Sequence, residues 1–207
     1  MVVLVTNLDA SLVARCREDD VSAFNEIVSR YKNKVYTYIS RMVGPGADAE
    51  DLTQETFVRA YVNLKSFQSR SSLNTWLFRI ATNICIDFSR KSGRIRAHSA
   101  SMTMSAEDGD EELEREIPDS RFDPQSMLLN KELGSKLEQA LAALPEKLRV
   151  VVLLHDIEGL QYEEIAAVVE CPLGTVKSRL FNARVSLREK LLPYLDGNIG
   201  GGQCAGA

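Results

Sequence analysis

The sequence predicts an all-α protein in which two small helical domains are joined by a flexible acidic linker. Apolar residues recur at intervals of three or four along most of the 207 residues, and no segment keeps the two-residue alternation of a strand. A segment rich in Ser, Met, Gly and acidic residues interrupts this pattern. We therefore expect a helical bundle, a linker, a second helical domain and a disordered tail, at residues 9–92, 93–127, 128–195 and 196–207.

Charge is distributed unevenly along the chain, whose net charge is −4. Residues 107–123 contain nine acidic and two basic side chains, a local charge of −7. Residues 65–96 carry a local charge of +6, and residues 172–192 carry +4. This separation predicts two basic faces and an acidic spacer.

The first domain is predicted to contain three or four helices. One apolar face runs through residues 24–42, and the Gly-Pro-Gly sequence at 44–46 ends that helix. The next helix covers residues 52–64. A further helix follows over residues 73–91, so that the domain forms a compact bundle.

The helix over residues 73–91 has two different faces. Ser71 or Ser72 is placed to cap it, and Trp76 lies on its apolar face, where a lone Trp usually belongs to the core. The opposite face presents four polar or charged residues: Arg79, Asn83, Asp87 and Arg90. An Asn one turn beyond an Arg suits contact with a nucleotide, and a solvated helix face is the alternative.

The preceding helix is acidic at its start, with Asp48, Glu50, Asp51, Gln54 and Glu55 close together. Carboxylates repel DNA, so beside basic segments they indicate a second, basic partner. Acidic residues also stabilise the first turn of a helix, which is the alternative explanation. Gln54 lies beyond that turn and therefore favours a binding surface.

The second domain is predicted to contain four helices, over residues 128–144, 146–157, 162–169 and 173–192. Pro145 begins the second of these helices. Glu158 and Gly159 follow that helix and turn the chain.

The last two helices have the features of a helix-turn-helix, whose second helix enters the major groove of DNA. Ile165 and the small Ala166 lie where the helices cross, Val176 packs back against them, and Pro172 suits the start of the second helix. Seven residues then supply groups for phosphates and base edges: Thr175, Lys177, Ser178, Arg179, Phe181, Asn182 and Arg184. A cationic helix in an unrelated bundle is the alternative, and Phe181 fits the core as well as it fits DNA.

Several classes of protein are disfavoured by composition. The four cysteines and two histidines lack metal-ligand spacing, so we expect no metal site. Reduced thiols predict a cytoplasmic protein. The apolar run at the N-terminus is too short for a signal peptide, and no stretch approaches the roughly 18 apolar residues of a membrane helix.

Three motifs resemble one family. They are DAEDLTQETFVRAY at residues 48–61, SSLNTWLFRIATNICIDFSR at 71–90, and the segment at 144–184 that contains the helix-turn-helix. In this order they resemble a bacterial RNA polymerase sigma factor of the extracytoplasmic-function group, which has sigma-70 regions 2 and 4 only. The resemblance covers about residues 9–195. It implies a non-enzymatic initiation subunit that binds core polymerase, directs it to the −35 and −10 promoter elements and stabilises the melted −10 strand. It also implies no catalytic residues, no cofactor and no small-molecule substrate.

The resemblance also implies individual roles. Asp51, Gln54 and Glu55 match the surface that docks on the clamp coiled coil of the largest polymerase subunit, and the flap region is a further polymerase contact. The implied contacts with the single-stranded −10 element are Phe67, Asn83 and Arg90, and we add Arg79 to them. The predicted recognition helix matches the −35 helix at Thr175, Lys177, Ser178, Arg179 and Phe181. An anti-sigma factor that covers both domains is also implied.

Two positions depart from the family pattern, and two other functions stay open. Asn182 stands where a basic residue is frequent, and Glu170 stands at a turn where Gly is frequent, although Glu tolerates positive φ poorly. A stand-alone helix-turn-helix regulator with an N-terminal sensing domain explains residues 161–184 but not the acidic helix. A redox metalloprotein rests only on four dispersed cysteines.

Overall fold

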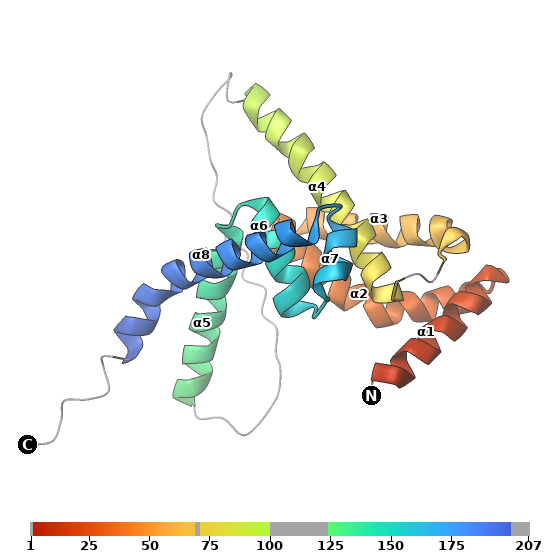
Figure 1. Ribbon diagram of the computed structural model, residues 1–207, viewed down its shortest axis with the longest axis horizontal. Coiled ribbons are helices and arrows are strands. Elements are labelled where there is room, and N and C mark those ends of the chain that lie inside the picture. The colour runs from red at the N-terminus through yellow and green to blue at the C-terminus, as the bar shows by residue number, and fades with distance from the viewer. Residues whose placement is uncertain (1, 69–70, 100–123, 200–207) are drawn as a thin grey trace, which may run out of the picture.

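The computed structural model describes residues 2–68, 71–99 and 124–199, and every element in these ranges is a helix, as the sequence predicts (Figure 1). The N-terminal half contains α1 (Val2–Arg17), α2 (Val21–Val43), α3 (Ala47–Asn63), a 3-10 helix (Leu64–Ser66) and α4 (Leu73–Ser99). The C-terminal half contains α5 (Pro124–Ala142), α6 (Glu146–Val152), a π-helical turn (Leu153–Ile157), α7 (Tyr162–Val168) and α8 (Leu173–Ile199).

Three helices continue further than the sequence indicated. Both ends of the segment predicted as a linker are helical, because α4 continues to Ser99 and α5 begins at Pro124. Helix α8 extends to Ile199, into the predicted tail. The acidic segment at 107–123 and the Gly-rich end at 200–207 lie outside the described residues.

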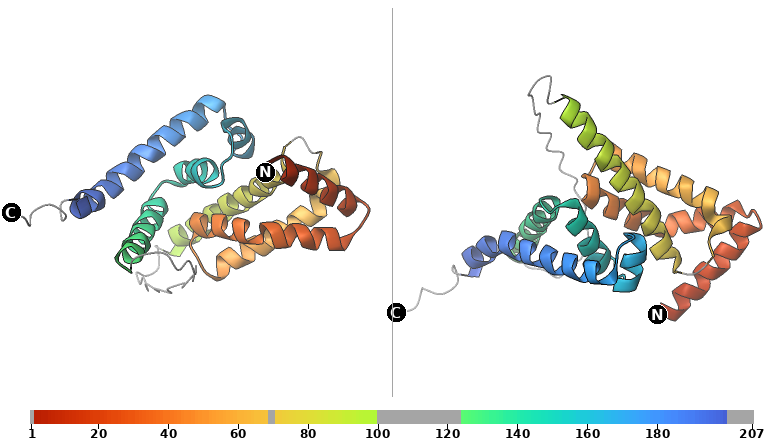
Figure 2. Two further views of the ribbon diagram at one scale, coloured as in Figure 1. Left: turned by 90° about the horizontal axis from the view of Figure 1, so that it is seen from below. Right: turned by 45° about the horizontal axis from the view of Figure 1, so that its top comes forward.

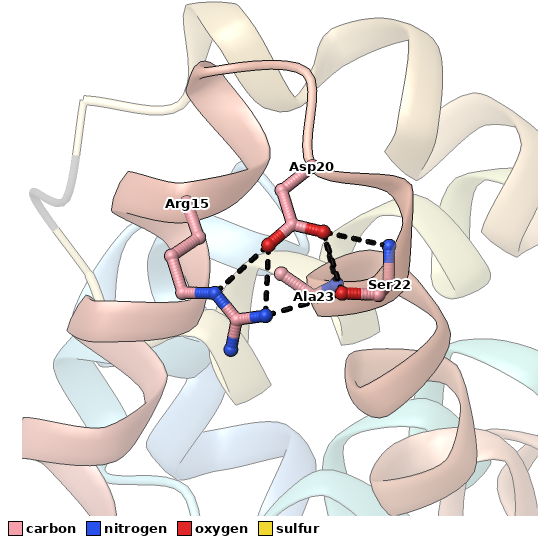
Figure 3. A network of polar contacts seen from close by, with 4 residues as sticks. All are labelled: Arg15, Asp20, Ser22 and Ala23. Atoms are coloured by element: carbon pink, nitrogen blue, oxygen red, sulfur yellow. Dashed lines mark hydrogen bonds and ion pairs between the residues drawn. The ribbon is translucent and has the colours of Figure 1, made fainter.

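The corner between α1 and α2 is fixed by Asp20 (Figure 3). One carboxylate oxygen accepts hydrogen bonds from the backbone N–H groups of Ser22 and Ala23, at 2.9 and 3.3 Å, and thereby caps α2. The other oxygen accepts two bonds from the Arg15 guanidinium, at 2.9 and 2.7 Å. The bonds from Ser22 and Arg15 lower the pKa of Asp20 to about 2.

The next two boundaries follow the predicted signals. Gly44 ends α2 with φ 98°, a conformation that glycine adopts without a steric penalty. Ser72 caps α4, because its hydroxyl oxygen accepts a hydrogen bond from the backbone N–H of Thr75 at 3.0 Å. The Ser72 cap sets the start of α4, a few residues after Phe67 in the sequence.

The N-terminal core lies between α2 and α4. Tyr38 and Phe78 meet edge to face with ring centroids 5.1 Å apart, and the Tyr38 hydroxyl shares a 2.7 Å hydrogen bond with Thr82. Both rings are at most 1% exposed. This packing fixes which side of α4 faces inward and therefore which side is available to a ligand.

The two halves pack against each other in the free chain. Helix α7 contacts α4, while α5 and α6 contact α2, and the buried apolar cluster extends from one half into the other. Arg149 of α6 donates to the carbonyl of Met42, at the end of α2, at 2.7 Å. Helix α8 lies on the outer side of the C-terminal half, away from α1 and α3 (Figures 1 and 2).

Candidate nucleic-acid interfaces

The helix-turn-helix consists of α7, a turn and the first part of α8. The backbone N–H of Gln161 donates to the Glu164 carboxylate at 2.9 Å, which caps α7. Ile165 and Val176 are fully buried where the helices cross, as predicted. At the turn, Glu170 has φ 50°, so a residue other than glycine occupies the left-handed region at a cost of roughly 1–2 kcal/mol.

Most residues predicted to contact the −35 element face solvent. The exposed ones are Lys177, Ser178, Phe181, Asn182 and Arg184, and the half-buried ones are Thr175 and Arg179. Phe181 is 68% exposed, whereas the adjacent Leu180 is 2% exposed in the core. This exposure excludes the core alternative for Phe181, and its contact with DNA stays a prediction.

Two of the basic side chains on α8 are oriented by contacts within their own half. Arg184 donates to both oxygens of the Asp156 carboxylate, at 3.1 and 2.5 Å. The Lys177 ammonium lies 5.9 Å from the ring centroid of Tyr162. The C-terminal half therefore positions cations along α8 without help from the rest of the chain.

The polar face of α4 is only partly open. Asn83 is exposed, and Arg90 extends into solvent with its guanidinium 3.9 Å from the Asp87 carboxylate. Arg79 instead donates to the carboxylate of Glu170, in the turn of the helix-turn-helix, at 2.7 Å. The structure thus leaves Asn83 and Arg90 in solvent and brings Arg79 to the other half of the chain.

Phe67 is buried beside a cavity. Its ring packs against Trp76 with centroids 4.9 Å apart, and Trp76 packs on the core, as predicted. Phe67 lines a cavity of about 330 Å³ together with Ser71, Ser72 and Leu73. A small-ligand pocket typically starts at about this volume, so Phe67 is placed to form the wall of a nucleobase site.

The opposite wall of this cavity belongs to α1, to which the sequence analysis assigned no role. Asp9, Ala10 and Val13 line it. The buried Asp9 carboxylate accepts hydrogen bonds from Arg30 at 2.9 Å and from the Tyr31 hydroxyl at 2.6 Å. Burial and the bond to Asp9 raise the pKa of Tyr31. The apolar run before Asp9 was the available sequence signal, but it was considered only as a signal peptide, for which it is too short.

The predicted polymerase-binding residues share the outer face of α3. Asp51, Gln54 and Glu55 are exposed, while Leu52 and Phe57 on the inner face are buried. The helix therefore separates a buried apolar side from an acidic side that a partner can reach.

The outer face of α3 adjoins a hollow and an apolar patch. A cavity of about 370 Å³ between α2 and α3 is lined by Lys32, Asn33, Tyr36, Glu50, Thr53 and Gln54. Further along α3, Val58, Tyr61 and Val62 are exposed. Mixed acidic, aromatic and aliphatic groups suit a protein partner better than DNA.

The structure describes the surroundings of Cys16, Cys85, Cys171 and His155. Among described residues, no group of three or more His, Cys, Asp or Glu side chains could hold a metal ion. Burial raises the pKa of the Cys16 and Cys85 thiols, that of Cys85 to about 12, which makes both poor nucleophiles. The His155 ring donates from Nδ1 to the Leu160 carbonyl at 2.8 Å. Within the described ranges, no helix is long and apolar enough to cross a membrane.

Comparison with known proteins identifies both halves. The Sigma-70 region 2 family model matches residues 27–95, and the Sigma-70, region 4 model matches residues 135–187. The chain is 38% identical over 188 residues to the ECF RNA polymerase sigma-E factor of Escherichia coli (strain K12), covering 90% of this chain and 96% of that protein. It is 36% identical over 187 residues to the protein of the same name from Haemophilus influenzae, covering 90% and 97%.

Solved structures give the same result. The sigma factor RpoE from Bartonella quintana, in a co-crystal with the anti-sigma factor NepR, has a TM-score of 0.61 and 27% identity, covering 81% of this chain and 96% of that one. CnrH, solved in complex with the cytosolic domain of CnrY, has a TM-score of 0.60 and 24% identity, covering 89% and 97%. The second similarity supports the fold alone.

Proposed function

The chain belongs to the extracytoplasmic-function group of the sigma-70 family, and from this premise we propose which of its surfaces carries each step of initiation. As a sigma factor, the protein binds core RNA polymerase and directs it to promoter DNA. Sigma factors are initiation factors rather than enzymes. The N-terminal half provides region 2, and the C-terminal half provides region 4.

Helix α8 recognises the −35 element as duplex DNA. The observation that carries this assignment is an exposed polar and aromatic stripe on a helix whose crossing with α7 is fully buried. Lys177 and Arg184 suit phosphates, Ser178 and Asn182 suit base edges, and the exposed Phe181 ring suits a thymine methyl group. Thr175 and Arg179 complete the set from half-buried positions.

The cavity beside Phe67 receives an unstacked base of the −10 strand. Flipping a base costs a few kcal/mol, and stacking in a pocket restores roughly 1–3 kcal/mol per base. Phe67, supported by its packing on Trp76, provides the aromatic wall, and Asn83 and Arg90 extend the strand path along α4. Arg79 lies on the same face and joins this path when it is released from Glu170.

The outer face of α3 docks on the polymerase. Asp51, Gln54 and Glu55 present acidic and amide groups, which suit the clamp coiled coil of the largest subunit, and region 4 contacts the flap. The protein is proposed to act in the cytoplasm, without catalytic residues or a cofactor of its own. An anti-sigma factor is proposed to hold it inactive, because RpoE from Bartonella quintana was solved with such a partner.

Run-off transcription with purified core polymerase tests this function. We expect start sites with shared −35 and −10 sequences, on a pool of promoter fragments, only when the protein is added. The free protein should bind DNA weakly, because its net charge is −4. No new start sites, together with duplex binding by the protein alone, would instead support a stand-alone helix-turn-helix regulator.

The polymerase-binding assignment has a matched test. The double charge reversal Asp51→Lys with Glu55→Lys should reduce binding to core polymerase at least tenfold, since each buried interface charge is worth several kcal/mol. The control reverses two other exposed acids, Glu18→Lys with Glu132→Lys, and should bind core polymerase like the wild type. Equal loss in both variants would indicate a nonspecific effect of net charge.

A further inference from the structure

Helix α8 presents three rows of side chains outside its buried face. An α-helix turns by about 100° per residue, which aligns side chains three, four or seven positions apart. The central row, opposite the buried face, consists of Gly174, Ser178, Phe181 and Val185. A cationic row on one side consists of Lys177, Arg184 and Arg188, and the row on the other side consists of Thr175, Arg179 and Asn182. The two flanks of the helix therefore offer different chemistry to DNA.

Two arginines of these rows already have partners in the C-terminal half. Arg184 is paired with the Asp156 carboxylate, and the half-buried Arg179 donates to the Cys171 Sγ at 3.7 Å. A guanidinium reads guanine by directing two N–H groups at O6 and N7 of the base. Each of these arginines would have to give up a contact within its own half to read a guanine in this way.

Asn182, by contrast, has its amide available. The side chain is exposed, and it has no polar partner among the described residues. Ser178, one turn earlier, uses its hydroxyl to donate to the Thr175 carbonyl at 3.0 Å. The Asn182 amide therefore offers an acceptor oxygen and a donor nitrogen, held in one plane, from the third turn of the helix.

The donor and acceptor of an amide match one base in the major groove. Adenine presents N6–H as a donor beside N7 as an acceptor, so that an amide forms two hydrogen bonds with it. Guanine presents two acceptors, cytosine a donor and thymine an acceptor beside a methyl group. The Asn182 amide can therefore make a two-bond pair with adenine and with no other base.

The apolar part of the central row favours the same base pair. Phe181 is 68% exposed, and Val185, one turn further along the helix, is 40% exposed. Thymine is the base that exposes a methyl group in the major groove, whereas a G·C pair exposes only polar groups there. Apolar side chains next to an amide therefore complement A·T pairs at both bases.

We infer that Asn182 determines one position of the −35 element by pairing with an adenine: its amide oxygen accepts from N6–H, and its amide nitrogen donates to N7. Phe181 and Val185 contact the methyl groups of thymines at this position or beside it. The inference rests on the proposed assignment of α8 to the −35 element and names the base that one side chain selects.

The test uses the polymerase holoenzyme and a pool of promoters with a randomised −35 element and a fixed −10 element. Sequencing of the templates that yield run-off transcripts gives the base preference at each −35 position. Asn182→Ala removes the amide, and Asn182→Arg supplies a side chain that pairs with guanine. The matched control is Glu163→Gln on α7, which raises the net charge by the same one unit as Asn182→Arg, also from an exposed position.

We expect the wild type to prefer adenine at one −35 position by roughly five- to hundredfold, the range for a good two-bond pair. Asn182→Ala should lose this preference and keep the preferences at the other positions. Asn182→Arg should prefer guanine at the same position, and Glu163→Gln should keep the wild-type preference throughout.

Three results would overturn the inference: a wild type with no adenine preference in the −35 element, an Asn182→Ala variant with unchanged preferences, or the loss of a preference for another base. Because Asn182 is exposed, Asn182→Ala should unfold thermally like the wild type, so its effect on base preference is not an effect of folding. Failure of the proposed function appears separately, as the absence of transcripts from every template with the wild-type holoenzyme.

Discussion

Two phenylalanines assigned to promoter recognition lie in opposite environments. Phe67, in the N-terminal half, is 7% exposed, whereas Phe181, in the C-terminal half, is 68% exposed. Two arginines also differ between the halves. Arg184 pairs with Asp156 in its own half, whereas Arg79 pairs with Glu170 in the other half. The comparison indicates that the surface proposed for duplex recognition is already exposed in the free chain. The surface proposed for strand recognition is partly buried at Phe67 and partly paired at Arg79.

Replacing each of the two phenylalanines with alanine should give the largest difference in the free energy of unfolding. Phe67→Ala removes a buried ring from its packing on Trp76 and should lower the free energy of unfolding by about 3–5 kcal/mol. Phe181→Ala, on the solvent side of α8, should change it by less than about 0.5 kcal/mol. Urea unfolding followed by circular dichroism measures both, and similar losses for the two variants would contradict the difference in burial.

The contact between α6 and α2 should give the next largest effect. Arg149 donates to the carbonyls of Met42, Ala142 and Leu144, and burial lowers the pKa of its guanidinium. Arg149→Met should reduce the free energy of unfolding by about 2–3 kcal/mol, because it leaves carbonyls unpaired. The matched control is the exposed Arg188→Met.

Small-angle X-ray scattering shows whether Arg149 also holds the two halves together or stabilises only its own half. We expect an increase in the radius of gyration for Arg149→Met and none for Arg188→Met. A compact Arg149→Met variant would show that this side chain stabilises only its own half.

Promoter recognition by Phe181 should be separable from stability. Phe181→Ala should reduce run-off transcription roughly tenfold, which corresponds to the loss of one apolar contact with a base. Thermal unfolding should stay as in the wild type. An unchanged transcript yield from a promoter with an intact −35 element would remove Phe181 from the recognition surface.

The smallest expected effect is on the pH dependence of folding stability, which should have opposite signs for one carboxyl group in each half. Hydrogen bonds lower the pKa of Asp20 from 3.8 to about 2, so the stability that it contributes is present above pH 3.8 and is lost as the pH falls toward 2. Burial raises the pKa of Glu158 above 4.5, against the opposing charges of Lys34 and Arg41. Its contribution is therefore fully present below pH 4.5 and is lost as the pH rises through the raised pKa.

Two conservative variants isolate these contributions. Glu158→Gln should flatten the stability profile above pH 4.5, and Asp20→Asn should flatten it below pH 3.8 while keeping a capping side chain. Urea midpoints measured between pH 2 and pH 8 give both profiles. A Glu158→Gln profile parallel to that of the wild type would show that this carboxyl group is not desolvated in solution.

The sequence alone determined most of the helices, the caps at Gly44 and Ser72, and the family. Ser72, Gly44 and the crossing of Ile165 with Val176 lie where local signals predicted them, because caps and apolar periodicity depend on neighbours within a few residues. Leu180 lies in the core and Trp76 packs against it for the same reason. The −35 residues are a surface of one helix, so their spacing was sufficient to place them together.

Tertiary structure decided what depends on distant segments. The role of α1 in the Phe67 cavity and the two hydrogen bonds from α4 to the carboxylates of Glu164 and Glu170 join residues about sixty to ninety positions apart. The periodicity of one helix carries no information about which other helix will pack on it. Glu170 shows this limit: the sequence left open whether its turn takes a positive φ, and only packing of the two halves placed its carboxylate on Arg79.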